Sequence, residues 1–127
     1  MSEYADGNPK TAIGSKKPPL HFIPPIAIAH MGLAMQNGGE KYGPFNWREK
    51  KVTASTYTDA AERHINSWRD GEDNASDSNI HHLGHAMASL AIILDAESID
   101  MLNDDRPKVK GAFSKFVDEY FEKNKGK

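Results

Sequence analysis

Apolar residues recur at helical spacing in three stretches of the chain, and each stretch is bounded by residues that start or stop helices. The expected helices begin near Pro25, near Ser55 or Thr58, and near Asn79, and they end at Gly38 and Gly39, at Gly71, and near Ala96. This pattern predicts an all-α fold whose helical core spans residues 26–97. Residues 52–58 hold enough β-branched side chains for a short extended segment, with no convincing strand to pair with it.

The two ends of the chain differ from this core. Residues 1–25 carry five of the seven prolines, so we expect an extended Pro/Gly-rich arm without a regular helix. Residues 108–124 hold an amphipathic stripe that predicts a C-terminal helix, either a fourth bundle helix or a docking helix. The whole chain, residues 1–127, is expected to form a single domain.

Composition narrows the classes of protein and partner. A net charge of −2 argues against binding to a nucleic-acid polymer, because phosphate backbones need clustered, uncompensated Lys and Arg. The chain has no cysteine, so a metal must be held by carboxylate, imidazole, carbonyl or water. Its apolar stretches are far shorter than the ~20 residues that span a bilayer, and no signal-peptide pattern opens the chain. We therefore expect a cytoplasmic protein without a membrane partner.

Three histidines open the third expected helix, at positions 81, 82 and 85. His82 and His85 are three residues apart, and His81 and His85 are four apart, so two imidazoles can lie on one side of the helix. Such a pair suits a metal ion or an anionic phosphate. Alternatively, His82 and His85 face the bundle interior and form hydrogen bonds with carboxylates of the preceding helix.

Carboxylates flank the turn between the second and third expected helices: Asp59, Glu62, Glu72, Asp73 and Asp77. Antiparallel packing of the two helices would bring these groups together. Mg²⁺ or Mn²⁺ takes oxygen ligands from a few carboxylates and keeps other positions for water and substrate phosphates. The set as a whole predicts a Mg²⁺ or Mn²⁺ site, although a solvated helix face with an acidic turn is the alternative for each residue alone.

Basic and aromatic residues lie mainly in irregular segments. Gly14, Ser15 and Lys16 offer backbone N–H groups, a hydroxyl and an ammonium to a phosphate, but they lack P-loop spacing. Asn46 and Trp47 could stack on a base and read its edge, or Trp47 could be an aromatic plug over the end of the bundle. The other cations with this potential are Lys10, Lys17, Lys41, Arg48 and Arg63.

Taken together, five segments resemble the phage dATP/dGTP diphosphohydrolases, which are MazG-like enzymes. These are residues 8–19, 41–48, 59–64, 71–73 and 82–85. The resemblance implies a MazG-like helical bundle, a homo-oligomer (dimer or tetramer), and Mg²⁺- or Mn²⁺-dependent cleavage of dATP or dGTP to the monophosphate and pyrophosphate. In phages that replace adenine with 2-aminoadenine, such enzymes remove dATP and supply dGMP.

On this interpretation, we assign roles to individual residues as a hypothesis. Substrate binding falls to Ile13, Gly14, Ser15, Lys16, Lys17, Lys41, Asn46, Trp47, Arg48, His64, His82 and His85. Catalysis falls to Glu62, Glu72 and Arg63, and metal binding to Asp59, Glu62, Glu72, Asp73 and Asp77. The wider MazG group carries paired Glu-x-x-Glu/Asp motifs on successive helices, whereas this chain reads Asp59-x-x-Glu62 and then His82-x-x-His85. We therefore expect the acidic loop, residues 72–77, to replace the missing carboxylates.

Two other functions compete with this interpretation. A His/Asp-type triphosphohydrolase would use the clustered histidines, but the chain contains no His-Asp dipeptide. A non-enzymatic helical phage protein could bind a host partner through the aromatic stripe of residues 113–121. That stripe could equally belong to the core or to a subunit interface.

Overall fold

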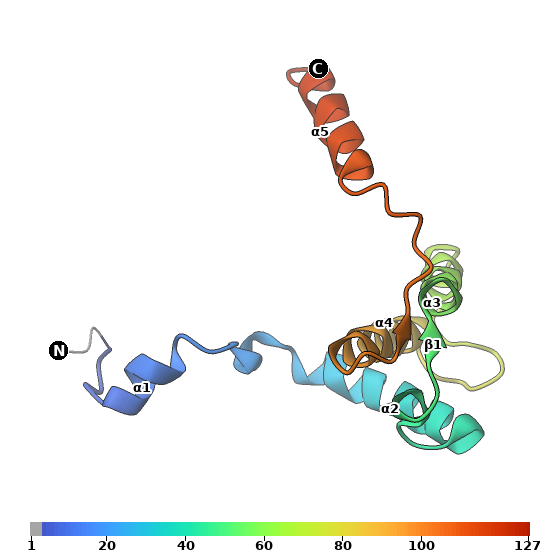
Figure 1. Cartoon of the computed structure of the whole chain (residues 1–127), viewed down its shortest axis with the longest axis horizontal. Helices are drawn as coiled ribbons and strands as arrows, with labels where there is room; N and C mark the ends of the chain where they lie inside the picture. Colours follow the sequence, from blue (N-terminus) through green and yellow to red (C-terminus); the bar gives the residue numbers. More distant parts are fainter. Residues whose placement is uncertain (1–3) are drawn as a thin grey trace.

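Three long helices form the centre of the molecule. The structure, a computed structural model, describes residues 4–127. The central helix, α4, packs against both α2 and α3 (Figure 1), whose bounds are α2 (Pro25–Tyr42), α3 (Ala54–Arg69) and α4 (His82–Ser98). The prediction of a mainly helical fold is confirmed, and a MazG-like arrangement stays a prediction.

A short two-stranded parallel sheet joins the segment before α3 to the segment after α4. Strand β1 (Val52–Thr53) pairs with β2 (Leu102–Asn103), so that Val52 lies opposite Leu102. The expected extended segment is therefore confirmed for its first residues. The expectation that it has no partner strand is wrong, because the partner comes 50 positions later, where local pattern gives no signal.

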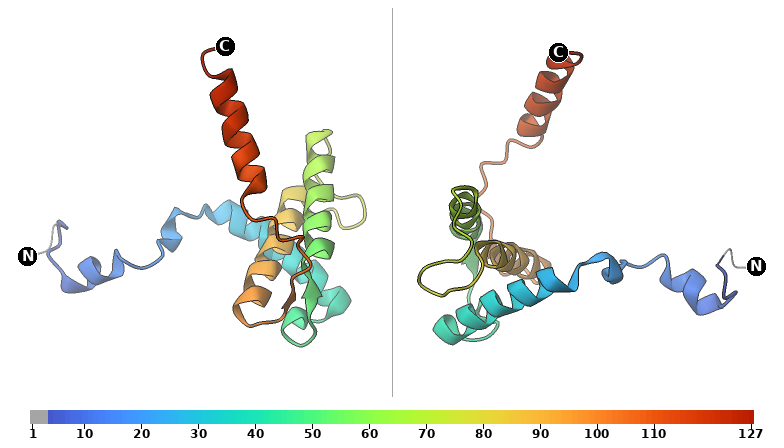
Figure 2. Two further views of the ribbon diagram at one scale, coloured as in Figure 1. Left: turned by 45° about the horizontal axis from the view of Figure 1, so that its top comes forward. Right: turned by 180° about the vertical axis from the view of Figure 1, so that it is seen from behind.

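The N-terminal arm and the C-terminal helix leave the centre in different directions (Figure 2). The arm holds α1 (Pro9–Gly14) and a 3₁₀ turn, η1 (Leu20–Phe22), and the chain ends with α5 (Ala112–Asn124). The prediction that the arm lacks a regular helix is wrong. Pro9 occupies the first turn, and the Asn8 side chain accepts a hydrogen bond from the Lys10 backbone N–H. Residues 1–3 of the predicted arm lie outside the described residues.

Two helix boundaries differ from the expected ones. Helix α2 continues through Gly38 and Gly39 and ends at Gly43, whose φ of 94° is the conformation that glycine adopts readily. Helix α4 begins at His82 instead of near Asn79, since Asn79 has a φ of 58° that no α-helix contains. The end of α3 before Gly71 is confirmed.

Helix starts are stabilised by groups that the sequence pattern does not indicate. Helix α3 starts at Ala54, and neither Ser55 nor Thr58 caps it. Instead, the Asp105 carboxylate accepts hydrogen bonds from the backbone N–H and the hydroxyl of Ser55, which places a negative charge at the helix N-terminus. His81 caps α4, because its Nδ1 accepts a hydrogen bond from the backbone N–H of Leu83 at 3.0 Å.

Small residues let α2 and α4 approach closely. A Cβ added to Gly84 would lie 2.7 Å from the backbone oxygen of His30, so only glycine fits at this crossing. Most buried apolar residues are alanines, and Trp47 is the largest buried side chain. Within the part of the chain that the structure describes, no helix has the length and apolar character needed to cross a membrane.

Candidate functional site: a pocket beside three histidines and Glu72

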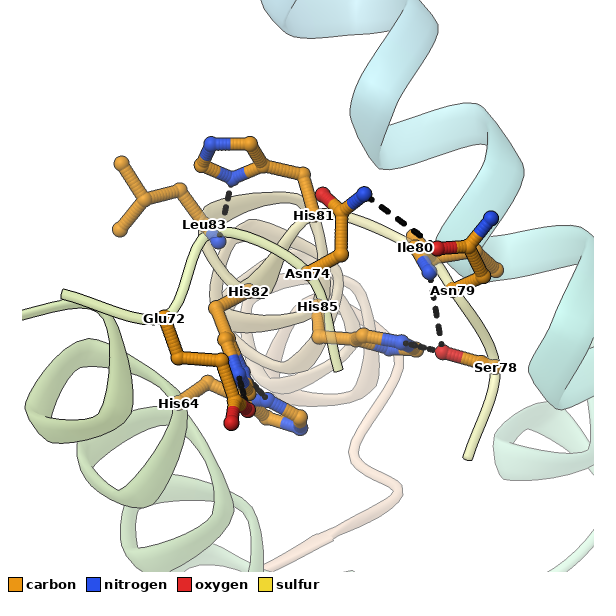
Figure 3. A network of polar contacts seen from close by, with 10 residues as sticks. All are labelled: His64, Glu72, Asn74, Ser78, Asn79, Ile80, His81, His82, Leu83 and His85. Carbon is orange, nitrogen blue, oxygen red and sulfur yellow. Dashed lines mark hydrogen bonds and ion pairs between the residues drawn. The ribbon is translucent and has the colours of Figure 1, made fainter. Parts of the chain in front are cut away.

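A buried histidine links the acidic loop to α3 (Figure 3). His82, at the start of α4, is only 5% exposed. Its Nε2 lies 2.5 Å from Oε1 of Glu72, and its Nδ1 lies 2.8 Å from Nδ1 of His64 on α3. The three side chains therefore form a continuous line from a half-exposed carboxylate, through a buried imidazole, to a second imidazole.

The partners in this line fix where the protons are. The Glu72 carboxylate accepts, so His82 Nε2 carries a proton and donates it. When His82 is neutral, its Nδ1 has no proton and must accept from Nδ1–H of His64. The Nε2 of His64 is then an unprotonated nitrogen with a free lone pair, which is the form of imidazole that accepts a proton from water.

His85 lies against the same group one turn further along α4. Its ring stacks on the ring of His64 with centroids 4.6 Å apart and planes 15° apart. Its Nε2 lies 2.8 Å from the Ser78 hydroxyl, on the loop before α4. Burial lowers the pKa of His85, and Asp77 opposes this effect while Lys41 adds to it. His85 therefore favours its neutral form.

The same physical cause acts on His64. Burial lowers its pKa first, followed by the nearby His85 and His82 rings, while Asp77 raises it. A lowered pKa keeps the imidazole neutral at pH 7. His64 is thus a neutral proton acceptor held in one orientation.

His64 and His85 line a pocket of about 250 Å³ between α2, α3 and α4. It brings together six of the residues predicted from the sequence: Lys41, Asn46, Trp47, His64, Asp77 and His85. They come from four separate segments of the chain. The pocket therefore offers a cation, neutral imidazoles, a carboxylate, an amide and an aromatic ring to one ligand.

Two of the predicted substrate-binding residues are fixed by Asp95. The indole N–H of Trp47 donates to its carboxylate at 2.7 Å, and Arg48 donates through Nε at 2.8 Å and Nη2 at 3.0 Å. These hydrogen bonds lower the pKa of Asp95 to about 2. Trp47 is buried and presents only part of its ring to the pocket, while the guanidinium of Arg48 is engaged by Asp95.

The predicted carboxylate cluster does not assemble within one chain. Asp59 and Glu62 are exposed on α3, as is Arg63. In the acidic loop, Glu72 contacts His82, and the Asp73 side chain is exposed while its carbonyl accepts from the His82 backbone N–H. Among residues 4–127, no three His, Asp or Glu side chains converge closely enough to hold a metal ion. The residues of a single chain therefore do not fit the expected Mg²⁺ or Mn²⁺ site.

None of the arm residues predicted to bind phosphate lines this pocket, and α1 lies apart from α3 and α4 (Figure 1). Ile13 and Gly14 end α1, and the Ser15 hydroxyl donates to the Ala12 carbonyl. Lys16 and Lys17 follow and are exposed. In a single chain the arm and the pocket are separate regions.

Sequence reasoning missed two polar residues of this region, Ser78 and Asp95. Ser78 has no distinguishing signal within a polar loop. Asp95 does have one: residues 82–94 contain no Asp, Glu, Lys or Arg, so the first carboxylate after an apolar run needs a partner. The sequence pattern indicates that the Asp95 carboxylate has a partner, but it does not identify Trp47 and Arg48 as the partners.

The fold and site thus define a mainly helical protein with a histidine-lined, partly cationic pocket. Comparison with known proteins gives the family: residues 7–106 match the model for the dATP/dGTP diphosphohydrolase N-terminal region, and the chain belongs to this family. It is also 29% identical over 90 residues to a dATP/dGTP diphosphohydrolase of Salmonella phage PMBT28. The match covers 71% of this chain but 30% of that relative. No solved structure matches the chain.

Proposed function

We propose that this protein hydrolyses purine deoxynucleoside triphosphates, dATP or dGTP, to the monophosphate and pyrophosphate. The observation that carries the proposal is the pocket in which Lys41 and two neutral histidines meet beside the buried His82 and its partner Glu72. The family match and the name of the phage relative support the same substrate class.

The pocket side chains divide between binding and proton transfer. Lys41 supplies a positive charge that can pair with a phosphate oxygen. Asn46 offers an amide that can read the edge of a base, next to the partly accessible ring of Trp47. His85 can donate or accept at the side of the pocket, because Ser78 engages one of its ring nitrogens.

His64 is positioned to take the proton of the attacking water. Its Nδ1 is used by His82, so its Nε2 is the nitrogen that remains for a pocket water. Water oxygen bonds to the α-phosphorus as the bond to the bridging oxygen breaks, and pyrophosphate leaves. A proton gained at Nε2 lets His64 release its Nδ1 proton to His82, whose positive charge faces Glu72. Glu72 would thus stabilise the charge that develops.

We also propose that hydrolysis requires Mg²⁺ or Mn²⁺, and the family resemblance alone supports this requirement. Phosphate binding by the arm cations Lys16 and Lys17 is likewise a prediction. So is the participation of Asp59, Glu62 and Arg63 in metal binding or catalysis. So is the role in infection, in which dATP is removed and dGMP is supplied for synthesis of a 2-aminoadenine nucleotide.

Product analysis tests the proposal. The purified protein is incubated with each of the four dNTPs, with Mg²⁺, with Mn²⁺ and with EDTA, and the products are separated by ion-exchange chromatography. We expect monophosphate and pyrophosphate from dATP or dGTP in the metal-containing samples. Deoxynucleoside with inorganic triphosphate would replace the proposal by a triphosphohydrolase, and no turnover of any dNTP would overturn it.

A further inference from the structure

The chain exposes far more surface than a compact monomer of its mass. Its accessible surface is 10183 Å² at 14.1 kDa. A folded monomer of this mass exposes about 6,700 Å², so the excess is roughly 3,500 Å². Two copies together therefore carry an excess of roughly 7,000 Å², which is more than the total surface of about 2,000–5,000 Å² that obligate homodimer interfaces bury.

Part of this excess lies on α5, whose large apolar residues are exposed in the part of the chain that the structure describes. Phe113 is 79% exposed and Phe116 is 67% exposed. The other large apolar residues of the helix, all exposed, are Val117, Tyr120 and Phe121. A 13-residue helix is marginal in water without tertiary contacts, so α5 needs a surface on which to pack.

The core presents an apolar groove that can receive such a helix. It lies between the start of α3, the outer side of α4 and the segment that follows β2. Ile93 and the exposed Leu94 of α4 line it together with Ala54, Leu102 and Pro107. Leu90 belongs both to this groove and to a second apolar hollow that extends toward Ile26 of α2, so the apolar surface is continuous.

The segment between β2 and α5 directs the helix of the same chain away from this groove. The Asp105 carboxylate accepts a hydrogen bond from the Ser55 backbone N–H, which holds the segment against the core. Within the segment, Arg106 pairs with Asp104. Figure 1 shows that α5 then projects outward. The groove lies at the point where this segment leaves, and two copies can therefore exchange helices across one two-fold axis.

We propose that the protein forms a homodimer in which α5 of each copy packs its aromatic side into the α3–α4 groove of the other. The exchange buries the apolar side of α5 and the α3–α4 groove of both copies in one symmetric interface. It also makes the predicted homo-oligomer specific, because it names the surfaces in contact.

Sedimentation velocity on the full chain, over a range of micromolar concentrations, tests the proposal. We expect a species of twice 14.1 kDa. Phe116→Ser on α5 and Leu94→Ser in the groove should each raise the dimer dissociation constant at least about tenfold. Glu122→Ser, on α5 but outside the aromatic stripe, is the matched control and should keep the dimer. The helix content of each variant, measured by far-UV circular dichroism, verifies that it folds.

Cysteine cross-linking distinguishes exchange from docking within one chain. The natural chain has no cysteine, so Leu94→Cys and Phe116→Cys introduce the only thiols. Mixing the two single variants under oxidising conditions should give a disulfide-linked dimer that neither variant gives alone. A monomer in sedimentation would overturn the proposal. So would a Leu94→Cys/Phe116→Cys double variant that forms its disulfide only within one chain. Neither readout depends on catalysis.

Discussion

Two regions of the molecule, the start of α4 and helix α5, differ in how their ring-bearing side chains meet solvent. At the start of α4, a polar side chain is buried and every ring nitrogen of His82 has a partner. On α5, large aromatic side chains are exposed in the part of the chain that the structure describes. Burial costs a polar group its hydration, and exposure costs an apolar group its packing. The polar groups at the start of α4 thus find their partners within one chain, whereas the apolar side of α5 needs a partner surface.

The pocket is present in a single chain, whereas residues 4–127 of that chain form no carboxylate metal site. The pocket, with its oriented imidazoles, is formed within one chain by α2, α3 and α4, together with Asn46, Trp47 and Asp77 from the segments that connect them. The carboxylates expected to bind metal, by contrast, are dispersed over an exposed helix side and a loop. Changes at the pocket should therefore alter chemistry, and changes at the helix crossings should alter stability.

The largest effect is expected at the proton acceptor. His64→Ala should lower kcat by about 10²- to 10⁴-fold, because general-base catalysis contributes that much. The rate of pyrophosphate release from dGTP measures it. His21→Ala, on the exposed arm, is the control and should keep the wild-type rate. Equal rates for His64→Ala and wild type would remove His64 from the mechanism.

A large effect on stability is expected where α2 and α4 cross. Gly84→Ala places a methyl group against the His30 backbone, and we expect a loss of about 1–3 kcal/mol in the free energy of unfolding. Gly32→Ala is the matched control, because no atom lies within 4 Å of its added Cβ. It should stabilise α2 by up to about 1 kcal/mol through helix propensity. Urea unfolding followed by circular dichroism gives both values, and a Gly84→Ala variant as stable as Gly32→Ala would contradict the close crossing.

A smaller effect on substrate affinity should distinguish the pocket from the arm. Lys41→Ala should raise KM about tenfold, the value of one charge-assisted hydrogen bond. The geometry of one chain gives a change in KM of less than about twofold for Lys16→Ala, because no described residue of the arm lines the pocket. Steady-state kinetics with dATP and dGTP gives both constants. A larger effect for Lys16→Ala would place the arm of some copy at the phosphates.

The smallest effect concerns the acid side of the stability profile. Asp95 has a pKa of about 2 in the folded chain against 3.8 as the ordinary value, so the folded state binds its proton less readily. Its contribution is complete above pH 3.8 and is lost as the pH falls toward 2. Asp95→Asn should lower the urea midpoint at pH 7 and show a smaller further decrease in acid than wild type. Asp118→Asn, on exposed α5, should follow the wild-type curve.

Local pattern predicts the helices and some of the site. Apolar periodicity locates α2, α3 and α4, and the spacing of His82 and His85 places two imidazoles together at the start of α4. What pattern misses depends on distant contacts: Asp105 reaches Ser55 and Asp95 reaches Trp47 across about 50 positions. Such pairs carry no periodic signal because only the tertiary fold creates them.

The site shows the same limit. His64 lies 18 positions before His82, and only antiparallel packing of α3 and α4 joins their Nδ1 atoms. Conversely, the carboxylates are close in sequence but are not gathered in space, because α3 presents Asp59 and Glu62 to solvent. Residue type and spacing therefore identified the pocket side chains better than their partners.

The measurement that tests the account most directly is ¹⁵N NMR of the histidine side chains during titration with a non-hydrolysable α,β-methylene analogue of dGTP. The free protein should show His64 protonated at Nδ1 and unprotonated at Nε2. Adding the analogue should shift the ring signals of His64 and His85 and leave His21 unchanged. A His64 ring protonated only at Nε2 when free, or a titration that moves His21 but neither pocket histidine, would contradict the account.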